Sequence, residues 1–260
     1  MEMVRRGLAD SRTEAQEAID QGLVTVDGGP ALKAATLVHA GQSIGLDRPP
    51  RTYVSRGGDK LAHALATFGV DPAGRTCLDA GISTGGFTHC LLEHGASHVH
   101  GFDVGYGQVH EQLRTDPRVS VNERTNIRDV TPDDLPRPLP TLLVCDVSFI
   151  ALKTVLPPLR QLGTEDAEAV VLVKPQFEAS REDVGKGGVV RDPEVWRRVL
   201  VEVAETAAAV GWRGFDVTAS PLVGPAGNIE FLAHLHHGHE DDRLPARIDA
   251  AVDEGRALAD

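Results

Sequence analysis

Residues 78–87 read LDAGISTGGF and place an apolar run, a glycine-rich turn and a helix start within ten positions. Small residues in such a turn let a ligand approach the backbone, and amides at the helix start can donate hydrogen bonds to it. The spacing differs from the G-x-G-x-x-G of turns that hold a pyrophosphate, so it favours S-adenosylmethionine over NAD. A purely structural glycine turn is the ordinary alternative. The candidate cofactor contacts in the turn are Gly81, Ser83, Thr84, Gly85, Gly86 and Phe87.

Short apolar runs alternate with helical patterns from residue 76 onward, which is typical of a doubly wound parallel sheet. The last two runs are separated only by a loop at 221–229, so they can pair as an antiparallel hairpin. Dinucleotide-binding dehydrogenases finish with further parallel units, whereas methyltransferases close with an antiparallel strand. The predicted fold is therefore α/β, a Rossmann-like sheet of the class I methyltransferase type. The expected strands are 76–80, 98–103, 119–123, 142–147, 169–174, 214–220 and 230–235, and the expected helices are 88–94, 152–162 and 193–210.

The first sixty residues show a different, α+β pattern. A polar helix pattern covers 12–21, and the alternating residues 23–28 predict a strand that enters a tight turn at Asp27-Gly28. Residues 37–46 have the pattern of another short strand pair, and a proline-containing stretch follows them, as in a linker. The expected boundaries are a small module at 1–48, a linker at 49–54, a catalytic domain at 55–238 and a polar acidic tail, or frayed helix, at 239–260.

Charge is distributed unevenly along the chain. Lys and Arg total 26 against 38 Asp and Glu, a formal net charge of -12, which argues against a protein that coats nucleic acid indiscriminately. Residues 1–60 carry eight basic and eight acidic groups, so a local basic face on this part is compatible with the total. No apolar run approaches the roughly 20 residues needed to cross a bilayer, and the N-terminus has no signal-peptide pattern. We therefore expect a cytoplasmic protein without a membrane partner.

No metal site is predicted. The three cysteines form no C-x-x-C pair, and none stands at metal-ligand spacing with a histidine. The segment HLHHGHE (234–240) would place His234 and His236 on one face of a strand, but no carboxylate-and-histidine helix motif supports a site there. We therefore expect reduced structural thiols and no bound metal.

Further polar and aromatic residues follow the expected strands. Asp103 lies 22 residues after Gly81 at a strand end, where a carboxylate can accept hydrogen bonds from ribose hydroxyls. Without the preceding turn it would be an ordinary solvated acid. Asn126 and Asp129 follow the next strand and are weaker candidates for an adenine contact, because Asn and Asp also favour loops for purely local reasons. Phe149 and Phe177 could contact a nucleotide base, but core packing is the simpler expectation.

Four ionisable residues lie at strand ends or in the segment that leads into the expected sheet: Lys60, Asp146, Lys174 and Glu230. The carboxyl ends of the strands of a doubly wound sheet meet in one crevice, so Asp146 and Lys174 can approach each other there. The chain has only five lysines beside 21 arginines, and lysine, unlike arginine, can release its proton when it is partly desolvated near another cation. We hypothesise that Lys174 removes the proton of a ribose 2′-hydroxyl during methyl transfer, with Lys60 as the neighbouring cation. The two carboxylates would orient the amines and the hydroxyl.

Characteristic motifs occur along nearly the whole chain: SRGGDKL (55–61), LDAGISTGGFTHCLL (78–92), FDVGYGQ (102–108), ERTN (123–126), CDVSFI (145–150), LVKPQFEA (172–179), VGKGGVVRDP (184–193) and GPAGNIEFL (224–232). Together they resemble the TlyA family, which belongs to the FtsJ-like ribose methyltransferases. The resemblance implies S-adenosyl-L-methionine as cofactor, with Asp146 also beside it, and a Lys-Asp-Lys-Glu tetrad that falls on the four residues named above. It implies cytidine 2′-hydroxyls of ribosomal RNA, within ribosomal subunits, as substrates.

The stretch GLADSRTEAQEAIDQGLVTVDGG (7–29) is similar to the alpha-L RNA-binding module of pseudouridine synthases and of a small-subunit ribosomal protein. Such a module recognises RNA by its shape and contacts its phosphates through a few basic side chains. Relatives usually carry a leader strand with an Arg-Leu-Asp before the stretch that corresponds to VRRGLADSR (4–12), and Met1-Glu2-Met3 stands there instead. Either the start codon is assigned late or the module is trimmed. The candidate RNA contacts are Arg5, Arg6, Arg12, Lys33 and Arg56.

Two other classes of function compete with an enzyme. The family has carried a haemolysin label, but the sequence offers no amphipathic basic helix or spanning segment that would support a membrane-active protein. A catalytically silent RNA-binding subunit is the second alternative, and the complete tetrad argues against it. The expected partner is ribosomal RNA within ribosomal subunits, and no obligate protein partner is evident.

Overall fold

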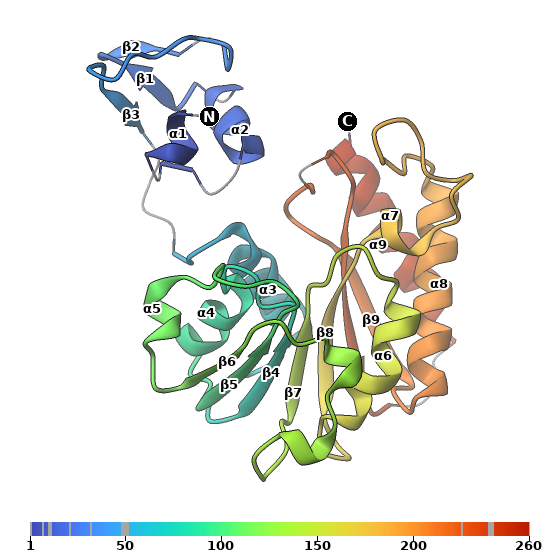
Figure 1. Ribbon diagram of the computed structural model, residues 1–260. Helices are drawn as coiled ribbons and strands as arrows, with labels where there is room; N and C mark the ends of the chain where they lie inside the picture. The colour runs from blue at the N-terminus through green and yellow to red at the C-terminus, as the bar shows by residue number, and fades with distance from the viewer. Residues whose placement is uncertain are drawn as a thin grey trace. The chain divides into compact units, whose positions relative to one another are not determined.

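The computed structural model describes residues 2–6, 8–9, 12–20, 22–31, 33–47, 52–224, 226–238 and 242–259, and at residues 12–14 and 17 it describes only the backbone. Contacts within the chain divide it into two units, residues 1–51 and 52–260 (Figure 1). The expected linker at 49–54 falls at this division, but residues 48–51 lie outside the described ranges. Each unit has its own apolar core, as separately folding domains do.

The smaller unit combines two short helices with an antiparallel sheet in the order β2-β1-β3. The predicted helix is confirmed, and so is the tight turn: Asp27 and Gly28 have φ of +49° and +81°, as a two-residue hairpin turn of the primed type requires. The elements are α1 (Glu2–Arg5), α2 (Arg12–Asp20), β1 (Val24–Val26), β2 (Gly29–Pro30) and β3 (Ile44–Leu46).

The predicted strand pair at 37–46 is wrong in its first half, because only β3 forms there. Leu37 is 86% exposed, so a strand at this position would bury no apolar surface. The Asp27 carboxylate instead accepts a hydrogen bond from the Ser43 amide at 2.8 Å, which holds the preceding loop against the hairpin turn. Local side-chain bonding of this kind competes with strand pairing.

A seven-stranded sheet forms the centre of the larger unit, in the order β6-β5-β4-β7-β8-β10-β9 (Figure 1). Neighbouring strands are parallel except at β10, which runs antiparallel to both β8 and β9. This arrangement confirms the predicted antiparallel last strand and differs from the parallel ending of a dinucleotide-binding dehydrogenase. The strands are β4 (Thr76–Ala80), β5 (His98–Phe102), β6 (Val119–Asn122), β7 (Leu142–Cys145), β8 (Glu168–Val173), β9 (Gly214–Ala219) and β10 (Phe231–His236).

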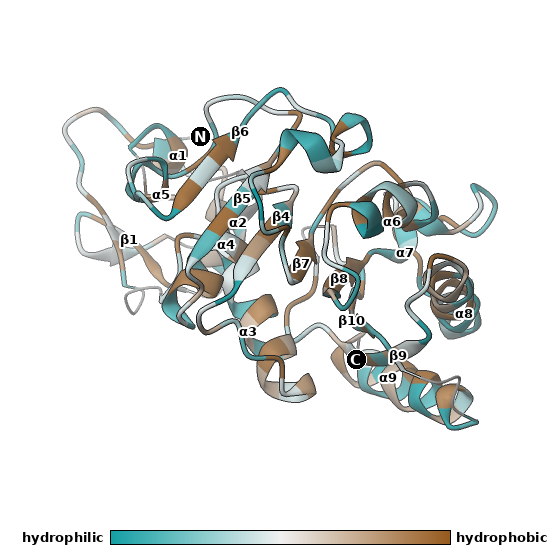
Figure 2. Cartoon of the chain, turned by 90° about the horizontal axis from the view of Figure 1, so that it is seen from below, coloured by the Kyte–Doolittle hydropathy of each residue, from teal (hydrophilic) through white to brown (hydrophobic). Residues whose placement is uncertain are grey.

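Helices cover both faces of this sheet. Alternate strand residues pack with α3 (Arg56–Phe68) and α4 (Gly86–Glu93) on one face, and with α6 (Leu152–Gln161), α8 (Pro193–Ala209) and α9 (Leu244–Ala259) on the other. Figure 2 shows β7, and β8 after its first residue Glu168, as hydrophobic, as expected for strands buried on both faces. The remaining short helices are α5 (Glu111–Arg114), α7 (Pro175–Glu178), η1 (Ile127–Asp129) and η2 (Pro132–Asp134).

The tail expected at 239–260 as polar, or as a frayed helix, forms the helix α9, which packs in the core. Its buried residues Ile248, Ala251 and Val252 are at most 1% exposed and belong to the core shared with α8. They recur three and four positions apart, which is the pattern of an amphipathic helix, although the average composition of the segment is polar. Within the described ranges, no helix is both long and apolar enough to cross a membrane.

Candidate active site

Glycines bring the start of α3 against the start of α4. A Cβ on Gly86 would lie 2.3 Å from the Ser55 hydroxyl and 2.9 Å from the backbone nitrogen of Gly58. Only glycine allows so close an approach of the two helices. Lys60 was expected in the segment that leads into the sheet, whereas it lies in the first two turns of α3 and is buried.

The turn after β4 is shaped by contact with the end of β7. Gly81 has φ of +89°, and a Cβ on it would lie 2.5 Å from the backbone oxygen of Asp146. The Ser83 amide, two residues on, donates to Oδ2 of Asp103 at 2.8 Å, and the Gly105 amide donates to Oδ1 at 2.6 Å. The Asp103 carboxylate therefore joins the turns that follow β4 and β5.

A cavity of about 520 Å³ opens at the carboxyl ends of β4, β5, β6 and β7. Its volume lies within the range of sites for small molecules and cofactors. Most of its lining, polar and apolar, comes from the segments that follow these strands. The structure brings five of the predicted cofactor contacts together in its wall: Gly81, Ser83, Asp103, Asn126 and Asp146.

The second half of the glycine-rich turn does not line this cavity. Phe87 is 3% exposed and packs in the core beside α3. A Cβ on Gly85 would lie 2.2 Å from Cδ1 of Leu113, so this glycine serves close packing. Thr84 and Gly86 are likewise absent from the lining. Gly85 and Gly86 therefore shape the turn and the start of α4 rather than the wall of the cavity.

Two apolar residues that line the cavity were not among the predicted cofactor contacts. Val104 and Ile127 line the cavity and directly follow Asp103 and Asn126. Their positions next to predicted contacts could have indicated them, because successive residues of a loop that enters a crevice tend to line the crevice. The Asn126 side chain itself accepts a hydrogen bond from the Arg128 amide at 3.1 Å, which fixes the start of η1.

Lys60 and Glu230 form the first of two buried ion pairs. Nζ of Lys60 lies 2.5 Å from Oε2 of Glu230, and the two residues are 7% and 2% exposed. Lys60 comes from α3, and Glu230 immediately precedes β10. Charges so deeply buried are stable only with a partner, so each of these side chains holds the other in place.

Lys174 and Asp146 form the second pair. Nζ of Lys174 lies 2.6 Å from Oδ1 of Asp146 and donates a hydrogen bond to the Ser148 hydroxyl at 2.9 Å. Asp146 and Ser148 follow β7, and Lys174 follows β8 and is 9% exposed. Ser148 was not predicted, because a serine in a loop carries no distinguishing sequence pattern.

Strand register brings the two ion pairs to the same end of the sheet, where the parallel strands have their carboxyl ends, and to the same face. Phe231 of β10 is paired with Val173 of β8, so Glu230 and Lys174 are the next residues along these two strands. Side chains alternate along a strand, so both share the face of Leu172 and Leu232, which pack in the core beside α3. The four predicted catalytic residues thus gather beside the cavity.

Phe149 corrects the expectation of core packing. It is 90% exposed, it lines the cavity, and its φ of +63° is unusual for a residue with a side chain. Its ring centroid lies 5.0 Å from that of Phe177, which in turn lies 6.0 Å from Nζ of Lys174. An exposed aromatic surface therefore lies close to the Lys174–Asp146 pair.

Asp79 is a buried carboxyl group within a largely apolar strand, so the sequence pattern did not mark it as a site residue. It is fully buried, Oδ2 accepts a hydrogen bond from the Thr88 hydroxyl at 2.7 Å, and Oδ1 has no hydrogen-bond partner among the described residues. Burial is the main cause that raises the pKa of Asp79 to about 7. The folded protein therefore keeps a proton here that the unfolded chain releases near pH 4.

Stability should fall as the pH rises because of Asp79. The folded pKa exceeds the unfolded value, so the contribution is fully present below about pH 4 and is lost as the pH rises through about 7. Asp79→Asn, which cannot ionise, should reduce this dependence by about 2–3 kcal/mol between pH 5 and pH 8. Urea unfolding at pH 5 and pH 8 measures the effect, with the exposed Asp129→Asn as control. Equal pH dependence in Asp79→Asn and wild type would contradict the assignment.

The predicted RNA contacts lie mainly in the smaller unit. Arg5 and Arg6 both pair with Glu2, and Nη1 of Arg6 also donates to the backbone oxygen of Gln42 at 2.7 Å. Lys33 is exposed. Arg56 belongs to the larger unit, where it begins α3, and the side chain of Arg12 lies outside what is described. Their contact with RNA stays a prediction.

The fold and the site define a class of protein. Residues 53–237 match the FtsJ-like methyltransferase family, and residues 2–44 match the S4 domain. These matches confirm the predicted S-adenosylmethionine-dependent methyltransferase domain and the small RNA-binding module before it.

The chain belongs to the TlyA family. It is 51% identical over 235 residues to the 16S/23S rRNA (cytidine-2′-O)-methyltransferase TlyA of Mycobacterium tuberculosis, a match that covers 90% of this chain and 87% of the relative. It is 39% identical to Hemolysin A of Brachyspira hyodysenteriae, over 88% of this chain and 95% of that protein. A solved structure described as a candidate hemolysin of Streptococcus thermophilus is 37% identical, with a TM-score of 0.80 over 98% of this chain and 94% of that one.

Proposed function

We propose that this protein transfers the methyl group of S-adenosyl-L-methionine to the ribose 2′-hydroxyl of a cytidine in ribosomal RNA. The observation that carries the proposal is the pairing of two buried lysines with two carboxylates at the edge of the sheet that bears the cavity. The name of the mycobacterial relative supplies the substrate class. The substrate would be met within ribosomal subunits in the cytoplasm, with the S4 domain as a contact to RNA.

The cavity suits the chemistry of this cofactor, which supplies a methyl group on a positively charged sulfur. Carboxylates of Asp103 and Asp146 line the cavity and would favour a cation there. Val104 and Ile127 offer apolar surface for a nucleobase. Asp103 would accept hydrogen bonds from the ribose hydroxyls, and Asn126 would contact the adenine.

Asp103→Ala should weaken the binding of S-adenosylmethionine by about 10–100-fold, because hydrogen bonds to a charged acceptor contribute about 1.5–3 kcal/mol. Titration calorimetry on the purified protein measures the affinity. Asp129→Ala is the matched control, since this aspartate is exposed and does not line the cavity. A similar loss in both variants would show that Asp103 has no specific role in binding.

Lys174 is the group that we propose to receive the proton of the 2′-hydroxyl. Lys174 is 9% exposed and is paired with Asp146 at the end of the sheet where Lys60 also lies. A lysine amine can exchange a proton with a substrate, which an arginine in its place could not do. Ser148 and Asp146 hold the amine in position.

The exposed face of Phe149 would serve the RNA side of the reaction. Any of the four nucleobases can stack on an aromatic ring, and such stacking contributes about 1–3 kcal/mol of binding free energy per base. This ring is 90% exposed at the lining of the cavity. Stacking there would bring the attached ribose towards Lys174.

Methyl transfer to isolated ribosomal subunits tests the proposal. Each subunit, taken from cells without this activity, would be incubated with the purified protein and S-adenosylmethionine that carries a labelled methyl group. We expect label in the RNA of at least one subunit. Absence of label from both, despite cofactor binding, would favour the alternative of a catalytically silent RNA-binding protein.

A further inference from the structure

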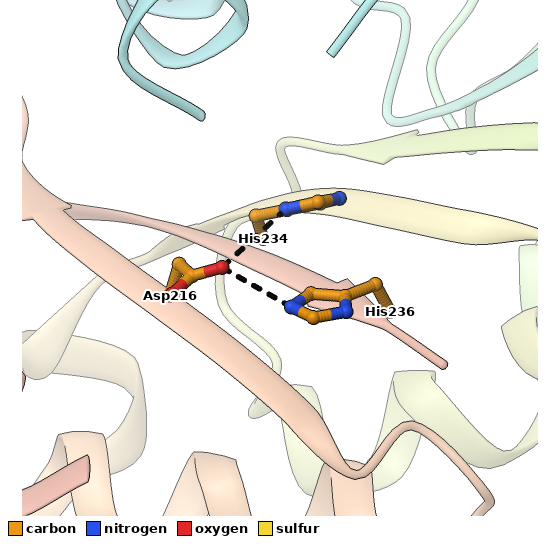
Figure 3. Close-up of side chains that lie close together, drawn as sticks. All are labelled: Asp216, His234 and His236. Carbon is orange, nitrogen blue, oxygen red and sulfur yellow. Dashed lines mark hydrogen bonds and ion pairs between the residues drawn. The ribbon is translucent and has the colours of Figure 1, made fainter. Parts of the chain in front are cut away.

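A second cluster of polar side chains lies at the opposite end of β10 from Glu230. Asp216, His234 and His236 each direct one potential ligand atom towards the others, and these atoms all lie within 4.8 Å of one another (Figure 3). Asp216 of β9 is paired in register with His234 of β10. The sequence pattern places the two histidines on one face but does not indicate their acidic partner, which comes from the neighbouring strand.

The hydrogen on His234 can be assigned from its contacts. Nε2 lies 2.6 Å from Oε2 of Glu168, and a carboxylate accepts hydrogen bonds, so Nε2 carries the hydrogen. In a neutral imidazole Nδ1 then has only a lone pair. Nδ1 is buried without a hydrogen-bond partner among the described residues, and it lies 3.8 Å from Oδ2 of Asp216. A lone pair facing a carboxylate is unfavourable unless a cation lies between them.

His236 presents its second nitrogen to the same carboxylate oxygen. Nε2 lies 3.1 Å from Oδ2 of Asp216, and Nδ1 lies 3.4 Å from the backbone oxygen of His237, which can accept the ring hydrogen. A Cβ on Gly214 would lie 2.2 Å from Cε1 of His236, so this glycine opposite the histidine makes room for the ring. Without an ion, Nε2 of His236 can donate its hydrogen to the Asp216 carboxylate. With an ion among the three side chains, His236 can carry its hydrogen on Nδ1 instead, so that both imidazoles direct a lone pair towards the ion.

Neighbouring groups hold the cluster in place. The ring of Phe68, at the end of α3, stacks on His234 with centroids 5.7 Å apart. A carboxylate behind a histidine, as Glu168 is here, is the usual outer partner of a histidine that binds a metal. Two cations lie nearby: Arg75 pairs with Glu168, and Nε of Arg247 lies 3.5 Å from Oδ1 of Asp216. Oδ1 thus faces a guanidinium, and Oδ2 faces both histidines.

We infer that Asp216, His234 and His236 bind a divalent transition metal ion of the Zn²⁺ type. Two imidazole nitrogens and one carboxylate oxygen suit Zn²⁺ better than Mg²⁺ or Ca²⁺, which prefer oxygen ligands alone. With bonds of about 2.0–2.1 Å, tetrahedral ligands lie about 3.4 Å apart, so modest side-chain rotation closes the site. The side chains of Asp216 and His236 are 38% and 33% exposed, which leaves a fourth position open to water.

The ion would be structural. His234 lies four residues from Glu230 along β10, about 13 Å at strand spacing, so the ion is remote from the proposed reaction. It would join the edge strand β9 to β10, whose other end carries Glu230. A proton could take the place of the ion if His234 were positively charged between Glu168 and Asp216, and the experiment separates these two cases.

Zn²⁺ binding to the full chain tests the inference. Protein freed of metal by a chelator would be titrated with Zn²⁺ in a calorimeter and with Co²⁺ in a visible spectrometer, where a tetrahedral ion absorbs strongly. We expect one equivalent per chain. Loss of a residue that only hydrogen-bonds to a metal ligand typically weakens metal binding by about 10–100-fold. Loss of a ligand itself, in Asp216→Asn or His236→Ala, should therefore weaken Zn²⁺ binding by at least about 100-fold.

His237→Ala is the matched control. His237 is exposed in the same histidine-rich segment but directs its ring to Arg160, so its loss should leave Zn²⁺ affinity unchanged. Zn²⁺ should also raise the melting temperature of wild type and of this control, but not of Asp216→Asn. Failure of wild type to bind one equivalent would overturn the inference in favour of the proton. Equal weakening in His237→Ala and His236→Ala would overturn it in favour of adventitious binding by the segment.

Discussion

Lys174→Ala is expected to lower the rate of methyl transfer by about 10²–10⁴-fold, the usual contribution of a positioned acid or base. The Lys174 side chain is 9% exposed, forms an ion pair with Asp146 and donates a hydrogen bond to Ser148. Its removal therefore takes away the amine that is held at the end of β8. Affinity for S-adenosylmethionine should stay within about threefold of wild type, because Lys174 does not line the cavity. Single-turnover methylation and calorimetry measure the two quantities separately.

Two further variants distinguish a proton acceptor from a fixed positive charge. Lys174→Arg keeps the charge and the donors but cannot release a proton, so it should be as inactive as the alanine variant. Lys153→Ala removes an exposed lysine of α6 and should retain full activity. An active Lys174→Arg enzyme would mean that Lys174 acts only through its charge.

Glu230→Ala is expected to lower the free energy of unfolding by about 3–5 kcal/mol, because it leaves the buried Lys60 ammonium without its partner. Activity should fall as well, since Lys60 would no longer be held at the sheet edge. Urea unfolding monitored by circular dichroism gives the stability, and the same methylation assay gives the activity.

A double variant separates stability from activity. Lys60→Met with Glu230→Leu replaces both charges by apolar groups, and such replacement of a buried pair is often neutral or stabilising. It should recover most of the lost stability and none of the activity. Wild-type activity in the double variant would remove Lys60 and Glu230 from the proposed mechanism, and full stability of Glu230→Ala would contradict the buried pairing.

Much of the fold could be predicted because apolar runs mark buried strands. The runs that end at Cys145 and Val173 are apolar throughout, and both became central strands of the sheet. The antiparallel ending followed from the short connection before Glu230. Helix α3 was missed because Gly57 and Gly58 disfavour a helix locally, and close packing against α4 overrides that preference.

The site could be predicted less completely, since it depends on which strands become neighbours. Lys174 and Asp146 were foreseen because strand ends converge in this type of sheet. The partners within the tetrad follow from register and from the approach of α3, neither of which a sequence pattern contains. The same limit applies to Asp216, which meets His234 only because β9 pairs with β10.

Ribose methylation itself is the central claim, and the chemical form of the product tests it most directly. RNA from ribosomal subunits treated with the protein would be hydrolysed in alkali, and the nucleosides identified by mass spectrometry. We predict 2′-O-methylcytidine in an alkali-resistant dinucleotide with wild type and none with Lys174→Ala. A methyl group on the base instead, with the adjacent phosphodiester still cleaved by alkali, would contradict the account.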